Sequence, residues 1–122
     1  MTVSFNKNVV PMGQVYVTAA PGNGGVVTLV PATNNPHGLI IRTLTLNVSN
    51  AGVNIYASVA APSSATDFSQ RIVYSYSNAS ATTATMPYEL YVYPGLAVYA
   101  TQSGTTGNVF MTYDPVVPDQ AA

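Results

Sequence analysis

The sequence predicts an all-β fold, a β-sandwich of about eight antiparallel strands, with a jelly roll as the favoured topology. Apolar residues recur with a period of two, as on strands with one buried face, and no segment shows the period of an amphipathic helix. Clusters of Gly, Pro, Asn and Ser separate the strand-like runs at spacings near the roughly 8 to 12 residues typical of sandwiches. Because 122 residues fit one core, we expect a single domain over residues 1–122.

The first half of the chain contains four predicted strands, rich in β-branched and aromatic residues. In the third, Ile40, Leu44, Leu46 and Val48 are expected to share the buried face. Arg42 falls on that same face, so the strand either ends or bends there. Residues 50–52, Asn-Ala-Gly, are expected to turn the chain into the fourth strand. The four predicted strands are residues 14–18, 26–30, 39–48 and 53–59.

Four more strands are predicted in the second half, separated by polar loops at residues 60–68, 78–85 and 104–108. Pro94 and Gly95 suit the central positions of a type II turn. Tight two-residue hairpins prefer type I′ and II′ turns, the mirror images of types I and II. A type II turn here therefore predicts a connection that splays the strands or crosses between sheets. Residues 114–122, with two prolines, are expected to form an extended tail. The four predicted strands are residues 71–77, 88–93, 96–100 and 109–113.

The low content of charged residues is the most unusual feature of the composition. Only 6% of the residues are Asp, Glu, Lys or Arg, and the formal net charge is -1, whereas a typical globular protein has about 25% charged residues. The predicted exterior is therefore neutral and rich in hydroxyl groups, which favours association. It indicates a protein that works in an assembly, and the alternative is a secreted β domain with a similar surface.

Three basic residues are too few for the basic stripe of a nucleic-acid interface, so no nucleic acid is expected as a partner. No run of residues has the length and apolarity of a signal peptide or of a membrane span. We therefore expect no membrane partner and synthesis in a cytosol. The absence of cysteine excludes a disulfide, a thiol nucleophile and a Cys/His zinc site.

The sequence offers little for catalysis, and a non-enzymatic protein is expected. His37 is the single histidine and stands in a Pro/Asn loop without a nearby acid. A small hydrolase would have to use it, with Asp67 or Asp114 as the orienting carboxylate, and no Gly-x-Ser-x-Gly motif is present. The four acidic residues are scattered, so we predict no metal site and no cofactor.

Nine tyrosines are the residues best suited to carry function. If Leu90 and Val92 face the core, then Glu89, Tyr91 and Tyr93 face outward, and the next strand places Tyr99 outward as well. Tyrosine offers a large rigid area with a polar tip, which suits protein interfaces and stacking on sugars. The plain alternative is that tyrosine simply has a high strand propensity.

Residues 38–42 (Gly-Leu-Ile-Ile-Arg) open a long strand, and residues 89–96 (Glu-Leu-Tyr-Val-Tyr-Pro-Gly-Leu) follow late in the chain. In these segments and in its style of composition, the chain resembles small virion proteins of tailed bacteriophages, most closely the jelly-roll decoration or cement type. The resemblance implies a homotrimer or homodimer on the capsid exterior, bound to the shell of the major capsid protein. It also implies terminal arms at residues 1–10 and 114–122, with Phe5, Asp114 and Val116 as contact residues.

The competing function is a carbohydrate- or receptor-binding β-sandwich module of a phage tail. It would use Tyr91, Tyr93 and Tyr99 as a stacking surface, with Glu89 beside the rings to bind hydroxyl groups.

Overall fold

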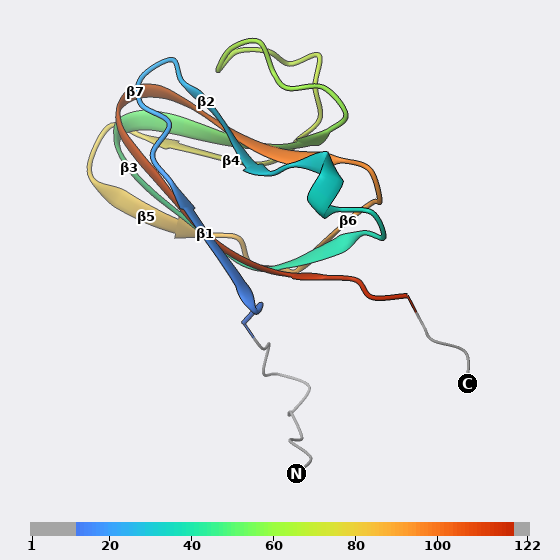
Figure 1. Cartoon of the computed structure of the whole chain (residues 1–122). Coiled ribbons are helices and arrows are strands. Elements are labelled where there is room, and N and C mark those ends of the chain that lie inside the picture. Colours follow the sequence, from blue (N-terminus) through green and yellow to red (C-terminus); the bar gives the residue numbers. More distant parts are fainter. Residues whose placement is uncertain (1–11, 119–122) are drawn as a thin grey trace.

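The structure is a computed structural model that describes residues 12–118, which form one antiparallel sheet of seven strands (Figure 1). Two strands, β3 and β7, are far longer than the others, and a 3₁₀ turn, η1 (Ala32–Asn34), precedes β3. The all-β prediction is confirmed, while the jelly-roll topology stays a prediction. The strands are β1 (Val15–Ala19), β2 (Val26–Val30), β3 (Leu39–Ser58), β4 (Ile72–Asn78), β5 (Thr82–Thr85), β6 (Leu90–Val92) and β7 (Ala97–Pro115).

The pairing of β3 with β7 is the centre of the sheet. Their register runs from Leu39 opposite Pro115 to Ser58 opposite Ala97. β1 and β2 pair with β7, whereas β4, β5 and β6 pair with β3. The sheet therefore has two halves, one with β1, β5 and β6 on the long pair and one with β2 and β4. Figure 1 shows these halves as a lower and an upper layer joined where β3 and β7 curve.

Both long strands bend where the two halves meet. Asn50 and Gly104 have positive φ angles of 48° and 96°, and the Asn50 side-chain nitrogen donates a hydrogen bond to Thr105 Oγ1 at 3.3 Å. An irregular residue of this kind shifts the alternation of a strand by one position. On β3 the core-facing positions are accordingly even from residue 44 to 48 and odd from residue 51 to 57.

The predicted turn at residues 50–52 and the predicted loop at residues 104–108 are therefore wrong. Asn50 and Gly104 do adopt the backbone conformation that turns need. Each nevertheless lies inside a continuous strand, because the paired strand bends at the same level and keeps its hydrogen-bonded register. Four of the predicted strands merge into two for this reason.

A second irregularity lies at Arg42, where the register of β3 with β7 shifts between Ile41 and Thr43. Of the two alternatives expected at Arg42, a strand end or a bend, both apply in part, because Arg42 lies near the start of β3 and beside this register shift. Because the alternation changes there, Leu39 and Ile41 are buried while Ile40 lies on the outer side, half-buried. The expectation that Ile40 shares the buried face with Leu44 is wrong.

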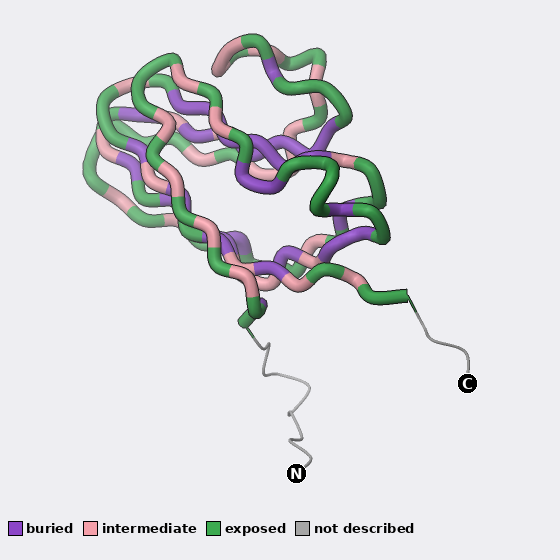
Figure 2. Tube along the Cα trace, in the orientation of Figure 1, coloured by how far each residue is buried: buried purple, intermediate pink, exposed green. Residues whose placement is uncertain are grey.

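One main core connects the two halves. Figure 2 shows buried residues along the strands of both layers. Fully burying an aliphatic side chain stabilises a fold by about 1.5–3 kcal/mol, so these strands supply most of the apolar stabilisation. The fully buried aliphatic members from the two long strands are Leu39, Ile41, Leu44, Leu46, Val48, Val53, Ile55, Val98 and Val109.

A tight turn joins β6 to β7. Gly95 has a φ of 83°, and the Leu96 backbone nitrogen donates to the Tyr93 carbonyl at 3.4 Å, as in a type II turn with Pro94 in its second position. β6 and β7 pair with opposite edges of β3 within one sheet, so this turn does not close a hairpin between them, and a crossing between two sheets stays a prediction. The buried Asn35 holds this turn, because its Nδ2 donates to the carbonyls of Tyr93 at 2.8 Å and Leu96 at 2.9 Å.

Two predicted irregular segments are in part regular. Residues 82–85 belong to the predicted loop 78–85 but form β5, in which Ala84 packs inward opposite Leu46. In the predicted tail, Asp114 and Pro115 are part of β7, and the Val116 nitrogen donates to the Gly38 carbonyl at 2.9 Å. The predicted arm 1–10 and residues 119–122 lie outside the described residues.

Candidate functional site

The outward side chains of the half that contains β1 and β5 form one continuous surface, which we call the open face. Directly paired residues of neighbouring strands point to the same side of a sheet. The register therefore aligns these side chains in three rows across the strands. The rows are Tyr16, Thr112 and Thr43; Thr18, Phe110, Thr45 and Thr85; and Asn108, Asn47 and Thr83.

The three rows of the open face carry hydroxyl, amide and aromatic groups and no charge, and Asp114, on the same side of β7 as Thr112, adds a charge at their margin. Thr43 and Thr112 share a hydrogen bond between their hydroxyl oxygens at 2.6 Å. Tyr16 is 62% exposed and Phe110 is 36% exposed, so both rings meet solvent. Uncharged surfaces with aromatic anchors lose little hydration energy when they dock, and they are typical of the centres of protein interfaces.

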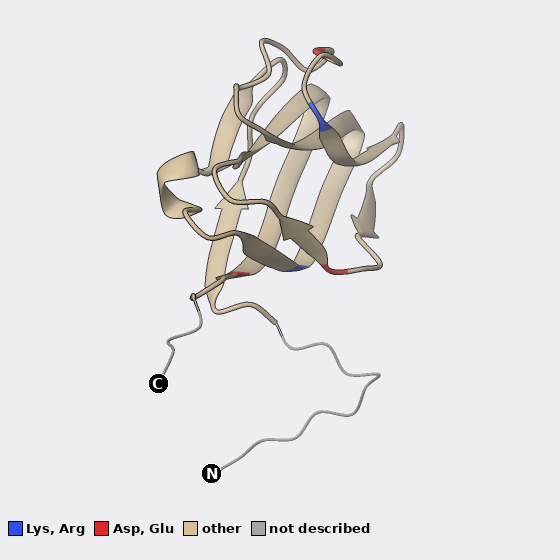
Figure 3. Cartoon of the chain, turned by 90° about the vertical axis from the view of Figure 1, so that its right-hand side faces the viewer, with Lys and Arg blue, Asp and Glu red and all other residues tan. Residues whose placement is uncertain are grey.

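A cluster of three charged side chains lies beside Ile40. The Arg42 guanidinium forms ion pairs with Glu89 and with Asp114, the latter from Nε to Oδ2 at 3.0 Å. The Gln14 backbone nitrogen donates to Asp114 Oδ1 at 2.8 Å, and this bond and Arg42 lower the pKa of Asp114 below its ordinary value. The bonds from Arg42 to Glu89 and Asp114 raise the pKa of Arg42. Figure 3 shows the charged positions in two groups at opposite ends of the molecule.

The structure brings several of the predicted partner-binding residues together. Ile40 is paired with Tyr91 on one side and with Asp114 on the other. Tyr91 is 47% exposed, Tyr93 is 61% exposed, and their rings form an edge-to-face pair with centroids 5.6 Å apart. Glu89 joins the group through Arg42, and Val116 follows β7 directly. Phe5 lies outside the described residues.

Tyr99 is not part of this group, and its predicted outward exposure is wrong. It does lie on the outer side of β7, but in the other half of the sheet, where it is only 8% exposed. There it packs with Tyr56 and Ala97 in a small second cluster, which we call the covered face. The loop of residues 59–71 lies over this side of the molecule (Figure 1), so an outward position on a strand does not expose the side chain.

The loop 59–71 is held in place by hydrogen bonds to polar side chains. Asn54 Nδ2 donates to the Ala65 carbonyl at 3.1 Å and ties the loop to β3. Within the loop, Asp67 accepts bonds from the hydroxyl and backbone nitrogen of Ser69 and from those of Ser63. These bonds, the Ser69 hydroxyl first among them, lower the pKa of Asp67 to about 2. The carboxylate is thus a fixed part of the loop.

Tyr16 and Phe110 of the open face were not among the predicted site residues. The sequence signal for this face is the set of outward residues in one predicted strand. In the predicted strand 39–48 the outward positions Thr43, Thr45 and Asn47 are all uncharged. The cross-strand neighbours that complete the face come from distant segments, and only the register of β1 and β7 reveals them.

His37 lies exposed in the loop before β3. Within residues 12–118, no group of three or more His, Cys, Asp or Glu side chains is placed to hold a metal ion. The described part of the chain contains no helix of the length and apolarity required to cross a membrane.

No protein-family model matches the sequence, and no curated protein is significantly similar to it.

Proposed function

We propose that this chain is a structural, non-enzymatic protein of a bacteriophage particle. In this proposal it is a decoration or cement protein on the capsid exterior, and it binds the shell of the major capsid protein through the open face. The observation that carries the proposal is the open face itself, with three rows of uncharged side chains around exposed Tyr16 and Phe110.

The physical argument rests on hydration and multiplicity. Charged side chains are depleted at the centres of protein interfaces because their desolvation is costly, and the three rows of the open face contain none, with Asp114 only at their margin. The open face consists of ten side chains in three rows, fewer than the roughly 20–30 residues a side of a standard protein interface, so a single copy supplies only a weak contact. Self-association into a dimer or trimer would present several copies at once, which raises the avidity for a symmetric shell.

The alternative, a carbohydrate-binding module of a phage tail, has lost part of its support. The expected stacking surface required Tyr91, Tyr93 and Tyr99 on one side, but Tyr99 is buried in the covered face. Docking through the open face needs no such arrangement and is favoured for that reason.

The first experiment is to measure the solution mass by light scattering over a range of concentrations. We expect a dimer or trimer that binds purified shells in co-sedimentation. A charge placed on the open face by Thr85→Lys should weaken shell binding by about tenfold or more, because the lysine must be desolvated. The matched control is Thr28→Lys, an exposed position on the edge strand β2 of the other half.

Each result bears on a separate part of the proposal. A monomer at all concentrations contradicts self-association. Failure of the unmodified protein to bind shells contradicts the capsid role. Equal shell binding by the Thr85→Lys and Thr28→Lys variants contradicts the assignment to the open face.

A further inference from the structure

A groove at the end of β3, next to the covered face, is independent of the open face. It consists of a hollow of about 490 Å³ and a smaller one of about 200 Å³. Ala57, Arg71 and Leu96 line both hollows, so the two meet at these residues. Their combined size is within the range of small-molecule sites, which are roughly 300–1,000 Å³.

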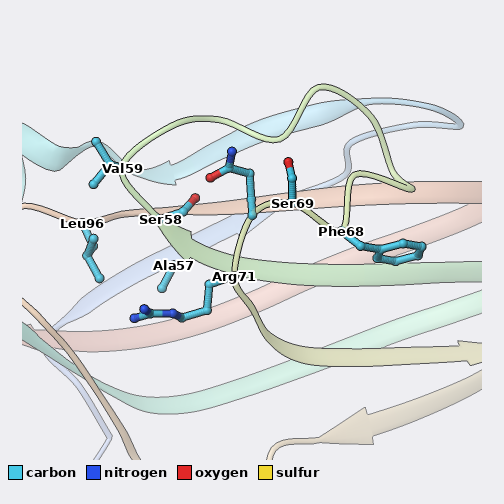
Figure 4. Close-up of a pocket in the computed structure, with 8 residues that line it drawn as sticks. Ala57, Ser58, Val59, Phe68, Ser69, Arg71 and Leu96 are labelled. Carbon is cyan, nitrogen blue, oxygen red and sulfur yellow. The ribbon is translucent and has the colours of Figure 1, made fainter.

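Arg71 supplies a positive charge to the groove. Within residues 12–118 its guanidinium group forms no ion pair and no hydrogen bond, and the residue is exposed. Arg42, in contrast, has two carboxylate partners. Figure 4 shows the Arg71 side chain extending toward Leu96 and away from Phe68. A guanidinium presents paired N–H donors that match a carboxylate, so charge complementarity favours a ligand with that group.

The larger hollow also offers hydrogen-bond acceptors. The Ser58 hydroxyl donates its proton to the Ala60 carbonyl at 2.7 Å, and the Ser69 hydroxyl donates to Asp67. Each hydroxyl oxygen therefore retains lone pairs for an incoming donor. Gln70 adds an amide to the lining, and Val59 and Leu96 add apolar side chains. A ligand with several hydroxyl groups and an apolar ring face fits this lining.

The smaller hollow is bounded by the tyrosine pair. Tyr91 and Tyr93 both line this hollow and are both exposed, and their rings form an edge-to-face pair. Aromatic rings stack on the apolar faces of sugars, so a second ring of an extended ligand has a surface there.

We infer that this groove binds a carboxylate-bearing sugar, such as a uronic or sialic acid. The carboxylate pairs with Arg71, the sugar hydroxyls donate to Ser58 and Ser69, and a neighbouring sugar ring lies against Tyr91 and Tyr93. This site does not depend on the open face or on capsid binding. An acidic peptide is the competing ligand, which the test distinguishes.

The test is an NMR titration of the full chain, labelled with ¹⁵N. The probes are methyl glucuronide, N-acetylneuraminic acid, the neutral methyl glucoside and a capped Ala-Glu-Ala peptide. We expect saturable shifts at the amides of Ser58, Ser69 and Arg71 with at least one acidic sugar. Binding of the neutral glucoside should be at least about tenfold weaker, because the charge-assisted hydrogen bonds to Arg71 are lost.

Substitutions connect the binding to Arg71. Arg71→Gln should lower the affinity for the acidic sugar by about tenfold or more, and Arg71→Lys should restore part of it, because the charge returns without the planar fork. The matched control is Arg42→Lys, which removes a guanidinium outside the lining of the groove but keeps the positive charge beside Glu89 and Asp114, and it should leave the affinity unchanged.

Three outcomes would overturn the inference: no shifts with either acidic sugar, equal affinity for the glucuronide and the glucoside, or unchanged affinity after Arg71→Gln. Tighter binding of the acidic peptide than of both acidic sugars would reassign the groove to a protein ligand. None of these outcomes affects the mass or the shell binding of the Thr85→Lys variant, so the two proposals can fail separately.

Discussion

The two outer faces of the sheet use similar residues in opposite ways. On the covered face, Tyr56 and Tyr99 lie opposite each other on β3 and β7 and are almost fully buried. On the open face, Tyr16 and Phe110 occupy equivalent outward positions on β1 and β7 and remain exposed. The side chains are alike, so what differs is the segment that lies above them. Burial here is decided by the connections between strands and not by residue type.

The lengths of those connections explain the difference. The loop between β3 and β4, residues 59–71, is long enough to pass over the covered face. The connections beside the open face, residues 20–25 after β1 and residues 86–89 after β5, are short. Among the described residues, the chain thus covers one outer face with its own loop and leaves the other exposed.

The largest expected effect comes from truncating one tyrosine on each face. Tyr56→Ala removes a fully buried ring and should lower the free energy of unfolding by about 3–5 kcal/mol. Tyr16→Ala removes a mostly exposed ring and should change it by less than about 0.5 kcal/mol. Urea denaturation of both variants measures the difference, and similar costs at the two positions would contradict the contrast between the faces.

A conservative change separates the ring of Tyr56 from its hydroxyl. That hydroxyl is buried and has no hydrogen-bond partner among the described residues. Tyr56→Phe should therefore leave the stability unchanged or raise it by about 1 kcal/mol, because no buried polar group is then left unpaired. A loss of stability in this variant would reveal a partner for the hydroxyl.

The bend that separates the faces provides a further prediction. Gly104 has a φ of 96°, and a Cβ atom there would meet the Asn50 carbonyl and lie 2.7 Å from Ala51 Cα. Gly104→Ala should destabilise the fold by about 3 kcal/mol, from backbone strain and steric overlap together. Gly22→Ala is the matched control, since Gly22 has a φ of 80° with open space around it, and it should cost only about 1 kcal/mol. If Gly104→Ala and Gly22→Ala lowered the free energy of unfolding equally, the backbone at the bend would have moved to avoid the steric overlap.

The third and smallest effect concerns the loop over the covered face. The pKa of Asp67 is lowered to about 2 from an ordinary 3.8, so the carboxylate stabilises the loop at every pH above about 4. This contribution is lost as the pH falls toward 2, and Asp67→Asn should remove part of it at neutral pH. The amide shifts of Ser63 and Ser69, followed by NMR, should titrate with a midpoint near 2. A midpoint near the ordinary value would mean that these hydrogen bonds do not persist in solution.

The sequence predicts the strands well and their connections poorly. Alternation identified residues 26–30 and 71–77 almost as the structure has them, because a half-buried strand imposes its period on the side chains. The prediction failed at Asn50 and Gly104, because these residues have the backbone conformation of turns but lie within strands. Whether such a residue reverses or bends the chain depends on the partner strand, which local sequence does not contain. The change from even to odd buried positions between Val48 and Val53 was the available signal.

The candidate site was predicted in part for the same reason. Outward positions on a single strand, such as Tyr91 and Tyr93, follow from alternation alone. The burial of Tyr99 depends on a loop that begins far away in sequence, and the rows of the open face depend on the register of four strands. The burial of Tyr99 and the composition of the open face are tertiary properties, so they cannot be predicted from the pattern of a single strand.

The pairing of β3 with β7 also determines how the chain is able to fold. Leu39 and Pro115 are partners although most of the described chain lies between them, and every other strand is attached to one member of this pair. Contacts between such distant residues form slowly, because a large loop must be closed before any of them stabilises the fold. During synthesis, β3 therefore leaves the ribosome long before its main partner exists. A nascent chain truncated before β7 should remain unfolded, and the sheet can be completed only after that strand has emerged.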